Sequence, residues 1–246
     1  MNNEGQDLYS AFGSNHWWLT GRYWIFKYYY DKYCSFDDLN ILDVGCGPAV
    51  IYEYIAADKH VRYIGLDASY YGLKLAKDNI QKNVFTCCDI LHAPFNSSLF
   101  DVVIGMDIIE HIDDDTAAVK EIHRLLKPGG LAFFCVPAFN FLWGDHDDRY
   151  GHKRRYTKES FAQVINTAKL DIVDLVYGQT IFFVPLFIFR QIRKFKRCCD
   201  DDFARTYGFC NKLLYFLMVI DFKIFRYLQL PLGCNIFCVA KKTKSD

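Results

Sequence analysis

The stretch "NILDVGCGPAV", from Asn40 to Val50, is the most informative part of this sequence about its fold. Its first half is a β-rich run, and its second half is a turn that contains Gly45 and Gly47. Two glycines between a strand and a helix let the backbone approach a ligand closely, and the helix that follows offers free N–H groups. The stretch therefore predicts the first strand and the ligand-binding turn of a parallel α/β sheet.

The residues of this turn distinguish a dinucleotide site from a site for an amino-acid-like ligand. A dinucleotide fingerprint needs a third glycine at the place that Val50 occupies, which disfavours a nicotinamide oxidoreductase. Asp43 stands two residues before Gly45, where a carboxylate can orient the turn and receive the amino group of an amino-acid-like ligand. A two-glycine turn is common by itself, so the prediction also depends on its surroundings.

Short β-rich runs alternate with helical patterns along most of the chain, which is typical of a parallel sheet with helices on both faces. The patterns predict an α/β fold with a seven-stranded, doubly wound, mostly parallel sheet. Strands are expected at 40–45, 61–67, 83–89, 101–106, 131–137, 171–177 and 235–242. Helices are expected at 49–58, 69–80, 115–126 and 156–170, with "KPGG" at 127–130 ending the third.

The composition narrows the class of protein. At 246 residues the chain can build its own core, and we expect one domain over residues 1–246. The 29 basic and 29 acidic residues balance, which argues against nucleic acid as a partner. Ten cysteines without a Cys-x-x-Cys pair are expected to be reduced thiols. The apolar runs 181–189 and 213–220 are too short for a bilayer span and no secretory signal is seen, so we expect a cytoplasmic protein.

Acidic residues stand at the ends of the next two expected strands. Asp67 ends "GLD", where a carboxylate can hold both hydroxyls of a ribose. Asp89 ends "CCD", where it can accept from an adenine amino group while Ile90 lies against the ring. Three successive strands thus present an acid to one ligand site.

Five motifs in this order and spacing resemble class I S-adenosylmethionine (SAM)-dependent methyltransferases, particularly the type 11 group that includes ubiquinone-pathway O-methyltransferases. The resemblance covers about residues 40–137. The motifs are "LDVGCGPA" (42–49), "GLDAS" (65–69), "CCDI" (87–90), "FDVVIGMDIIEHIDD" (100–114) and "LLKPGG" (125–130). Three outer stretches, at 15–26, 143–157 and 230–242, are similar to a bacterial-type subgroup linked to glycan or lipid-linked saccharide pathways.

The resemblance implies a Rossmann-like class I fold with an antiparallel last strand, a helical insertion before it, and SAM as co-substrate. It implies a SAM-binding core at 40–137 and an N-terminal helical lid at 1–38, in which Trp17 or Trp18 helps closure and Arg22 reaches the methionyl carboxylate. Ala49 replaces a glycine that many relatives carry and is expected to leave room for the ligand. The implied SAM-binding residues are Arg22, Asp43, Gly45, Gly47, Asp67, Ala68, Asp89, Ile90, Met106 and Asp107.

Methyl transfer from a sulfonium mainly requires alignment of the acceptor and exclusion of water. If the acceptor is a hydroxyl, a base assists, and His111 or His146 can serve because histidine titrates near neutral pH. Each of them can instead be a packing or surface residue. A divalent metal is a further alternative: Asp107, Glu110 and His111 have the spacing of one helical face, and a similar run holds magnesium in some relatives.

The stretch "WGDHDDRYGHKRRYT" (143–157) mixes acids, bases and histidines. Because unpaired charges are costly to bury, we expect it on the surface as part of an acceptor-side loop at 138–157. Arg154 and Arg155 can clamp a phosphate or carboxylate of the acceptor, with Tyr156 packed beneath. The alternative is a solvated, salt-bridged loop without a ligand.

Residues 179–230 form a hydrophobic and basic insertion. It can pack over the sheet or form a dimer contact, or it can lie in a membrane interface and make the protein membrane-peripheral. In the membrane view Arg190, Arg193, Lys194, Lys196 and Arg197 face anionic head groups, and Pro185 argues against one unbroken helix through the first half.

The sequence favours an enzyme that methylates a small-molecule, glycan or lipid-linked acceptor, with O-methylation preferred. The alternatives are a non-catalytic, membrane-associated adaptor that keeps the SAM pocket, and a nicotinamide oxidoreductase. The acceptor and the oligomeric state stay open, because acceptor chemistry lies in loops that a fold does not determine.

Overall fold

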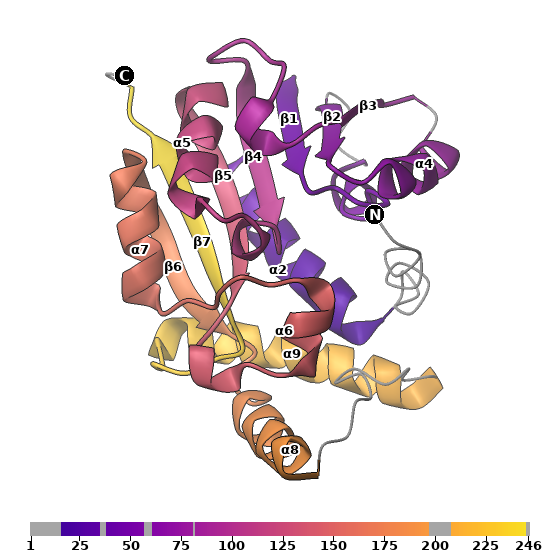
Figure 1. Cartoon of the computed structure of the whole chain (residues 1–246), viewed down its shortest axis with the longest axis vertical. Coiled ribbons are helices and arrows are strands. Elements are labelled where there is room, and N and C mark those ends of the chain that lie inside the picture. Colours follow the sequence, from indigo (N-terminus) through magenta and orange to yellow (C-terminus); the bar gives the residue numbers. More distant parts are fainter. Residues whose placement is uncertain (1–15, 35–37, 57–60, 81, 197–207, 245–246) are drawn as a thin grey trace.

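The computed structural model describes residues 16–34, 38–56, 61–80, 82–196 and 208–244. One seven-stranded sheet crosses the molecule in the order β3-β2-β1-β4-β5-β7-β6 (Figure 1). The strand β7 is antiparallel to both of its neighbours, and the other paired strands are parallel. The predicted fold class, including the antiparallel last strand, is confirmed.

All seven strands lie where the sequence places them, within a few residues. Their bounds are β1 (Leu39–Val44), β2 (Val61–Asp67), β3 (Val84–Cys87), β4 (Phe100–Met106), β5 (Leu126–Pro137), β6 (Leu170–Gly178) and β7 (Asn235–Lys242). The third predicted helix, α5, ends at Leu125, just before the motif "KPGG" as predicted, and the motif itself lies inside β5, which begins at Leu126. The strand accommodates these residues because its pairing with β4 shifts register, from Phe100↔Leu126 to Val102↔Leu131.

The helices of the described chain are α2 (Trp17–Tyr33), α3 (Tyr52–Ile55), α4 (Tyr70–Asn79), α5 (Asp115–Leu125), α6 (Asp145–Tyr150), α7 (Lys158–Thr167), α8 (Phe183–Lys196) and α9 (Gly208–Leu228), with 3-10 turns η1 (Ile90–His92), η2 (Ile109–His111) and η3 (Asn140–Leu142). Side-chain caps begin α4, α5 and α7, where Ser69, Asp114 and Thr157 accept backbone N–H groups. The expected helix at 49–58 is reduced to α3 in the described part of the chain.

Helices cover both faces of the sheet (Figure 1). On one face, α5 and α7 bury Ile122 and Phe161 in a core with the central strands. On the other face, α2 buries Ile25 and Phe26, and α9 adds Phe222. The cysteines in the described residues are free thiols, as expected, while Cys198 and Cys199 lie outside them.

The insertion before β7 contains α8 and α9, which lie in the lower part of Figure 1. The expectation that Pro185 interrupts the helix is wrong, because α8 begins at Phe183 and Pro185 is its third residue. A proline in the first turn breaks no intrahelical hydrogen bond. Within the described ranges, no helix has both the length and the apolar character that a membrane crossing requires.

Asp221 fastens α9 to the segment between β6 and α8. Its buried carboxylate accepts the backbone N–H groups of Thr180 at 3.0 Å and Ile181 at 2.7 Å. Burial raises the pKa of Asp221, and the hydrogen bonds from these N–H groups lower it. The carboxylate thus gains donors, and the N–H groups of the segment gain an acceptor.

We expect Asp221→Leu to lower the free energy of unfolding by about 2 to 4 kcal/mol, because it leaves partly buried N–H groups without an acceptor. Urea unfolding followed by circular dichroism measures the change. Asp221→Asn keeps one acceptor oxygen and should lose less. The exposed Asp78→Leu is the control and should change stability little; equal losses in all three variants would contradict the anchoring role of Asp221.

Candidate functional site

The carboxyl ends of β2, β1 and β4 lie side by side at one edge of the sheet. In this order the chain leaves β1 in one direction to reach β2 and β3, and in the other to reach β4 and β5. Ligands of open α/β sheets bind at such a switch point. Asp43 of β1 is paired in register between Gly65 and Ile104, Asp67 ends β2, and Asp107 follows β4.

The turn after β1 has the backbone conformation that its glycines allow. Gly45 and Gly47 have φ of 72° and 49°, and a Cβ atom on Gly45 would lie 2.9 Å from the side chain of Ile108. Ala49 also has a positive φ, 58°, and is fully buried. Alanine therefore occupies a left-handed position in which glycine would be unstrained.

Asp67 joins the end of β2 to this turn. One carboxylate oxygen accepts the N–H of Gly47 and the other accepts the N–H of Ser69, both at 2.7 Å. Burial raises the pKa of Asp67 although both N–H groups lower it. Asp67 thus fixes the turn after β1 through Gly47, and the prediction that both residues bind a ligand stays a prediction.

Asp43 is almost completely buried and accepts a hydrogen bond from the Tyr63 hydroxyl at 2.6 Å. Burial raises the pKa of Asp43 to about 7, because the hydroxyl only partly replaces the lost water. A buried carboxyl that titrates near neutral pH is typical of a functional position.

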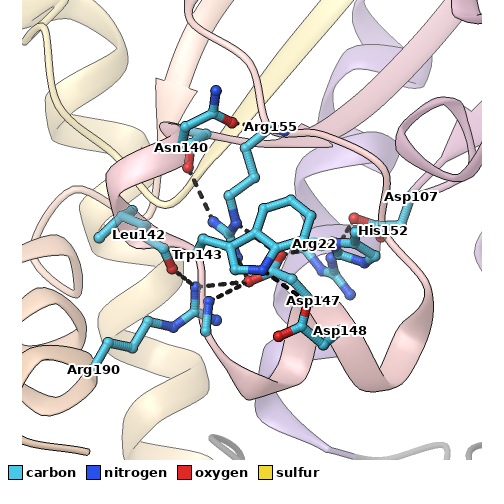
Figure 2. Close-up of polar contacts among 12 residues, drawn as sticks. Arg22, Asp107, Asn140, Leu142, Trp143, Asp147, Asp148, His152, Arg155 and Arg190 are labelled. Carbon is cyan, nitrogen blue, oxygen red and sulfur yellow. Dashed lines mark hydrogen bonds and ion pairs between the residues drawn. The ribbon is translucent and has the colours of Figure 1, made fainter. Parts of the chain in front are cut away.

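Arg22 from α2 forms an ion pair of 2.6 Å with Asp107 (Figure 2). Asp107 has a φ of 55°, so the chain turns sharply where β4 ends. The Nε atom of Arg22 is buried and has no hydrogen-bond partner among the described residues. The sequence predicted Arg22 and Asp107 as separate ligand contacts, whereas the structure pairs them directly.

The remaining expected SAM-binding residues lie around these strand ends. Asp89 is exposed and caps η1 by accepting the N–H of Leu91 at 3.0 Å, and Ile90 behind it is buried. Ala68 is exposed after β2, and Met106 is half-buried at the end of β4.

Glu110, His111 and His152 form a second cluster beyond β4. Their ligand atoms all lie within 4.8 Å of one another. The carboxylate of Glu110 is fully buried, and neither oxygen has a hydrogen-bond partner among the described residues. Burial, and then the charge of Asp107, raise the pKa of Glu110 well above its ordinary value. An unpartnered buried carboxylate calls for a ligand or a bound proton.

The sequence predicted Asp107 as the third member of this cluster and missed His152. Asp107 is instead paired with Arg22, and His152 comes from the segment after α6. The N–H of Lys153 donates to the carbonyl of Glu110 at 2.8 Å, which brings the two segments together. This contact joins residues 43 positions apart, and no spacing rule in the sequence indicates it.

The two histidines expected as bases lie near each other. The ring of His146 stacks on Tyr150 with centroids 4.1 Å apart, and both His111 and His146 lie edge-on to His152 at 4.7 and 5.8 Å. Burial, and then the neighbouring His152, lower the pKa of His111 to about 4. His111 is therefore neutral at pH 7 and a weaker base than an ordinary histidine.

The stretch 143–157 lies mostly at the surface, as the sequence predicted, but it contains the helix α6 and three buried residues, Asp147, Arg155 and Tyr156. The carboxylate of Asp147 is completely buried, and its polar contacts are drawn in Figure 2. Five groups donate to this carboxylate: the Gly144 N–H, His152 Nδ1, both Arg155 Nε and Nη2, and Arg190 Nη1. Charges can be buried when they are paired and fully hydrogen-bonded, which the composition of the stretch alone did not reveal.

This network corrects two predicted roles. Arg155 does not clamp an acceptor, because it is buried against Asp147 and the Ala138 carbonyl. Arg190 does not face lipid head groups, because it is buried and donates to the carbonyl of Leu142 and to Asp147.

Arg154 and Tyr156, the neighbours of Arg155, pair with Asp115 rather than with Asp147. Arg154 is partly exposed, with an ion pair to Asp115 at 3.1 Å. Tyr156 is buried and donates to Asp115 at 2.9 Å, so the prediction that it packs beneath the stretch holds.

Three other residues were predicted to face lipid head groups. Lys194 and Lys196 lie in α8 at positions where the side chains are not described, and Arg197 lies outside the described residues.

We expect Arg155→Met to lower the free energy of unfolding by about 3 to 5 kcal/mol, because it removes a partner of a buried carboxylate. Lys153→Met, the matched control two residues away, should cost less than about 1 kcal/mol, because its ion pair with Asp113 is exposed on both sides. Urea unfolding of both variants measures the difference. Similar, small losses in the two would show that Arg155 is not a structural residue.

Comparison with known proteins shows which proteins this chain resembles. Residues 42–134 match the family described as "Methyltransferase domain". Ubiquinone biosynthesis O-methyltransferase of Coxiella burnetii (strain Dugway 5J108-111) is 30% identical over 118 residues, which are 46% of this chain and 50% of that protein. An uncharacterised protein of Methanocaldococcus jannaschii is 29% identical over 157 residues, 63% of each chain. The chain thus spans about half the length of the ubiquinone-pathway relative that it matches.

Solved structures share the fold. A SAM-dependent methyltransferase from Archaeoglobus fulgidus is 14% identical with a TM-score of 0.56, covering 89% of this chain and 94% of that one. Phosphoethanolamine N-methyltransferase 2 of Haemonchus contortus, solved with SAM, is 19% identical with a TM-score of 0.59, covering 89% and 53%. The cyclase SpnF is 20% identical with a TM-score of 0.63, covering 92% and 82%.

These likenesses and the sheet order agree. Residues 42–134 match a methyltransferase domain, and the described chain shares its Rossmann-like fold with solved SAM-dependent methyltransferases.

Proposed function

We propose that this protein transfers a methyl group from SAM to an acceptor. The observation that carries the proposal is the set of carboxylates Asp43, Asp67 and Asp107 at the carboxyl ends of three adjacent strands, beside a turn with two left-handed glycines. The match of residues 42–134 to a methyltransferase domain supports it.

The residues at this edge fit the chemical groups of SAM. The buried carboxyl of Asp43 suits a cationic amino group, and Asp67 suits ribose hydroxyls because its carboxylate stands at the end of β2. Arg22 has a buried Nε without a hydrogen-bond partner among the described residues, which suits the methionyl carboxylate. We assign Gly45 and Gly47 to close backbone approach, and Ala68, Asp89, Ile90 and Met106 to the adenosyl side of the site.

SAM supplies an activated methyl group on a sulfonium, so the chain needs mainly to bind, orient and exclude water. The ion pair between Arg22 and Asp107 joins α2 to the end of β4, which favours α2 as the element that closes over the ligand, the role expected for residues 1–38. We place the acceptor beside His111, His146 and His152, because these rings gather next to Asp107 and Glu110.

The acceptor class is the finer part of the proposal. The ubiquinone-pathway relatives favour O-methylation, and the three outer stretches favour an acceptor from a glycan or lipid-linked pathway. The nicotinamide alternative is disfavoured by Val50, which occupies the third-glycine position. A role without methyl transfer has one observation in its favour, since SpnF, described as a cyclase, shares this fold.

The cluster of Glu110, His111 and His152 is proposed to hold a divalent metal ion beside the acceptor. His152 Nδ1 is bound to Asp147 at 2.8 Å, which leaves Nε2 for a ligand, as in carboxylate-oriented metal ligands. The unpartnered carboxylate of Glu110 supplies the charge. A divalent ion at this position would lower the pKa of an acceptor hydroxyl, a task for which His111 with its lowered pKa is poorly suited.

Asp43→Asn tests the SAM site. The pKa of Asp43 is raised to about 7, so its folded-state stabilisation is full below pH 4 and is lost as the pH rises to about 7. The uncharged Asn escapes this loss, and we expect its Tm at pH 8 to exceed that of the wild type by roughly 5 °C. SAM affinity should fall at least about tenfold at pH 8.

Calorimetry with SAM and with NADH at pH 6 and pH 8 measures the binding, and Asp78→Asn is the matched control. Wild-type affinity for SAM should rise from pH 6 to pH 8, and NADH should not bind. Unchanged SAM affinity in Asp43→Asn would remove the assigned role of Asp43. Absence of SAM binding by the wild type would overturn the proposed function. If the wild type does bind SAM, transfer of labelled methyl groups to extract fractions identifies the acceptor.

Glu110→Gln tests the metal site without an activity assay. Metal-stripped wild type, titrated with Mg²⁺, Mn²⁺ and Zn²⁺ in a calorimeter, should bind one ion, and the variant should bind it at least roughly tenfold more weakly. The exposed Glu53→Gln is the control and should bind like the wild type. No ion uptake by the wild type would mean that Glu110 is simply a protonated buried acid.

A further inference from the structure

The outward face of α9 carries an apolar stripe along its whole length. Six large apolar residues follow one another at intervals of three or four positions, which places them on one line of the helix. They are Phe209, Leu213, Phe216, Ile220, Ile224 and Tyr227. Phe209 is 79% exposed and Tyr227 75% exposed. Leu213, Phe216 and Ile224 are also exposed, while Ile220 is half-buried. Such exposed apolar surface marks an interaction site.

The helix α8 has a similar outward face. Val184, Ile188 and Ile192 are spaced by four residues and are all exposed, and Phe187 and Phe189 lie exposed on either side. We call these residues of α8 and the stripe of α9, taken together, the α8–α9 apolar surface.

The core does not need these residues, because the opposite faces of both helices are already packed. Phe183 and Leu186 of α8 and Met218 and Leu214 of α9 meet in one cluster with Trp17, Trp18, Leu142 and Cys234. Both helices therefore bury apolar side chains inward and expose apolar side chains outward.

Among the described residues of α8 and α9, the exposed charges have one sign. The exposed or half-exposed charged residues described on α8 and α9 are Arg193, Lys212, Lys223 and Arg226, and the acid described on these helices, Asp221, is buried under α9. The whole chain is neutral, so the basic excess here is local. Arg193 lies over the ring of Phe189, and Arg226 lies over that of Tyr227, which keeps the cations next to the apolar side chains.

We infer that the α8–α9 apolar surface docks on an anionic lipid bilayer, with both helices lying in the plane of the head groups. Exposed apolar rows flanked by basic residues are the pattern of interfacial helices, and neither helix is suited to cross the membrane. A second copy of the chain is the competing occupant. It is disfavoured because a two-fold contact of like faces would bring the basic residues of both copies together.

Docking would also place the proposed acceptor site near the lipid. The inward side of α8 sends Arg190 to Asp147, and Asp147 holds His152 of the metal cluster (Figure 2). Figure 1 shows α6, α8 and α9 in the same part of the molecule. An amphiphilic acceptor held in the bilayer would therefore lie close to this cluster; this consequence rests on the proposed function, whereas docking does not.

Vesicle flotation of the full chain tests the inference. Vesicles of phosphatidylcholine alone are compared with vesicles that contain phosphatidylserine, at low and high salt. The stripe variant combines Phe209→Ser, Phe216→Ser and Tyr227→Ser, and the charge variant combines Lys212→Glu and Lys223→Glu. The control is Tyr70→Ser, which removes an equally exposed aromatic residue from α4.

Wild type and control should float with the anionic vesicles and bind the neutral ones at least roughly tenfold more weakly. Both designed variants should lose at least about tenfold in affinity for anionic vesicles while their Tm and SAM binding stay unchanged. Wild type that floats with neither vesicle overturns the inference. Light scattering then shows whether a dimer sensitive to the stripe variant occupies the surface instead. SAM calorimetry on the same samples separates this failure from failure of the proposed function.

Discussion

The buried carboxylate of Asp147 is the interaction on which the loop side of this molecule depends. Buried charge is tolerated only when it is paired and hydrogen-bonded, and Asp147 meets this condition with donors from three separate segments. It orders α6 through Gly144, holds the segment of His152 and Arg155, and receives Arg190 from α8. One carboxylate therefore couples the insertion before β7 to the polar groups beyond β4.

The sheet edge obeys the same constraint with different partners. Asp43 is satisfied by a tyrosine hydroxyl, Asp67 by two backbone N–H groups, and Asp107 by Arg22. Each acid is therefore partly compensated within the chain, which holds the strand ends and the turn after β1 in place. Glu110 is the exception, because its two oxygens find no partner within the described chain. These two unbonded oxygens are the structural reason for proposing a ligand beside Glu110.

The helices α8 and α9 pack against the rest of the protein on one side and expose apolar residues on the other. Their inward sides carry the polar anchors Arg190 and Asp221 together with apolar side chains, and their outward sides carry apolar residues beside basic ones. Folding is secured by the anchors, which leaves the outward residues available for another surface. The region is thus specified by where its few buried polar groups are held rather than by hydrophobicity alone.

The sequence by itself determined the strands, most helices, and the positions of Asp43, Asp67 and Asp107, because periodicity and turn residues act over short stretches of chain and parallel strands end at a common edge. Packing between distant segments was needed to show that Arg22 pairs with Asp107, that Arg155 and Arg190 are buried on Asp147, and that His152 joins Glu110 and His111. The physical reason is that a charged stretch is equally compatible with water and with a distant buried partner. Local sequence carries no record of which charges will meet, since that choice is made by packing between segments far apart in the chain.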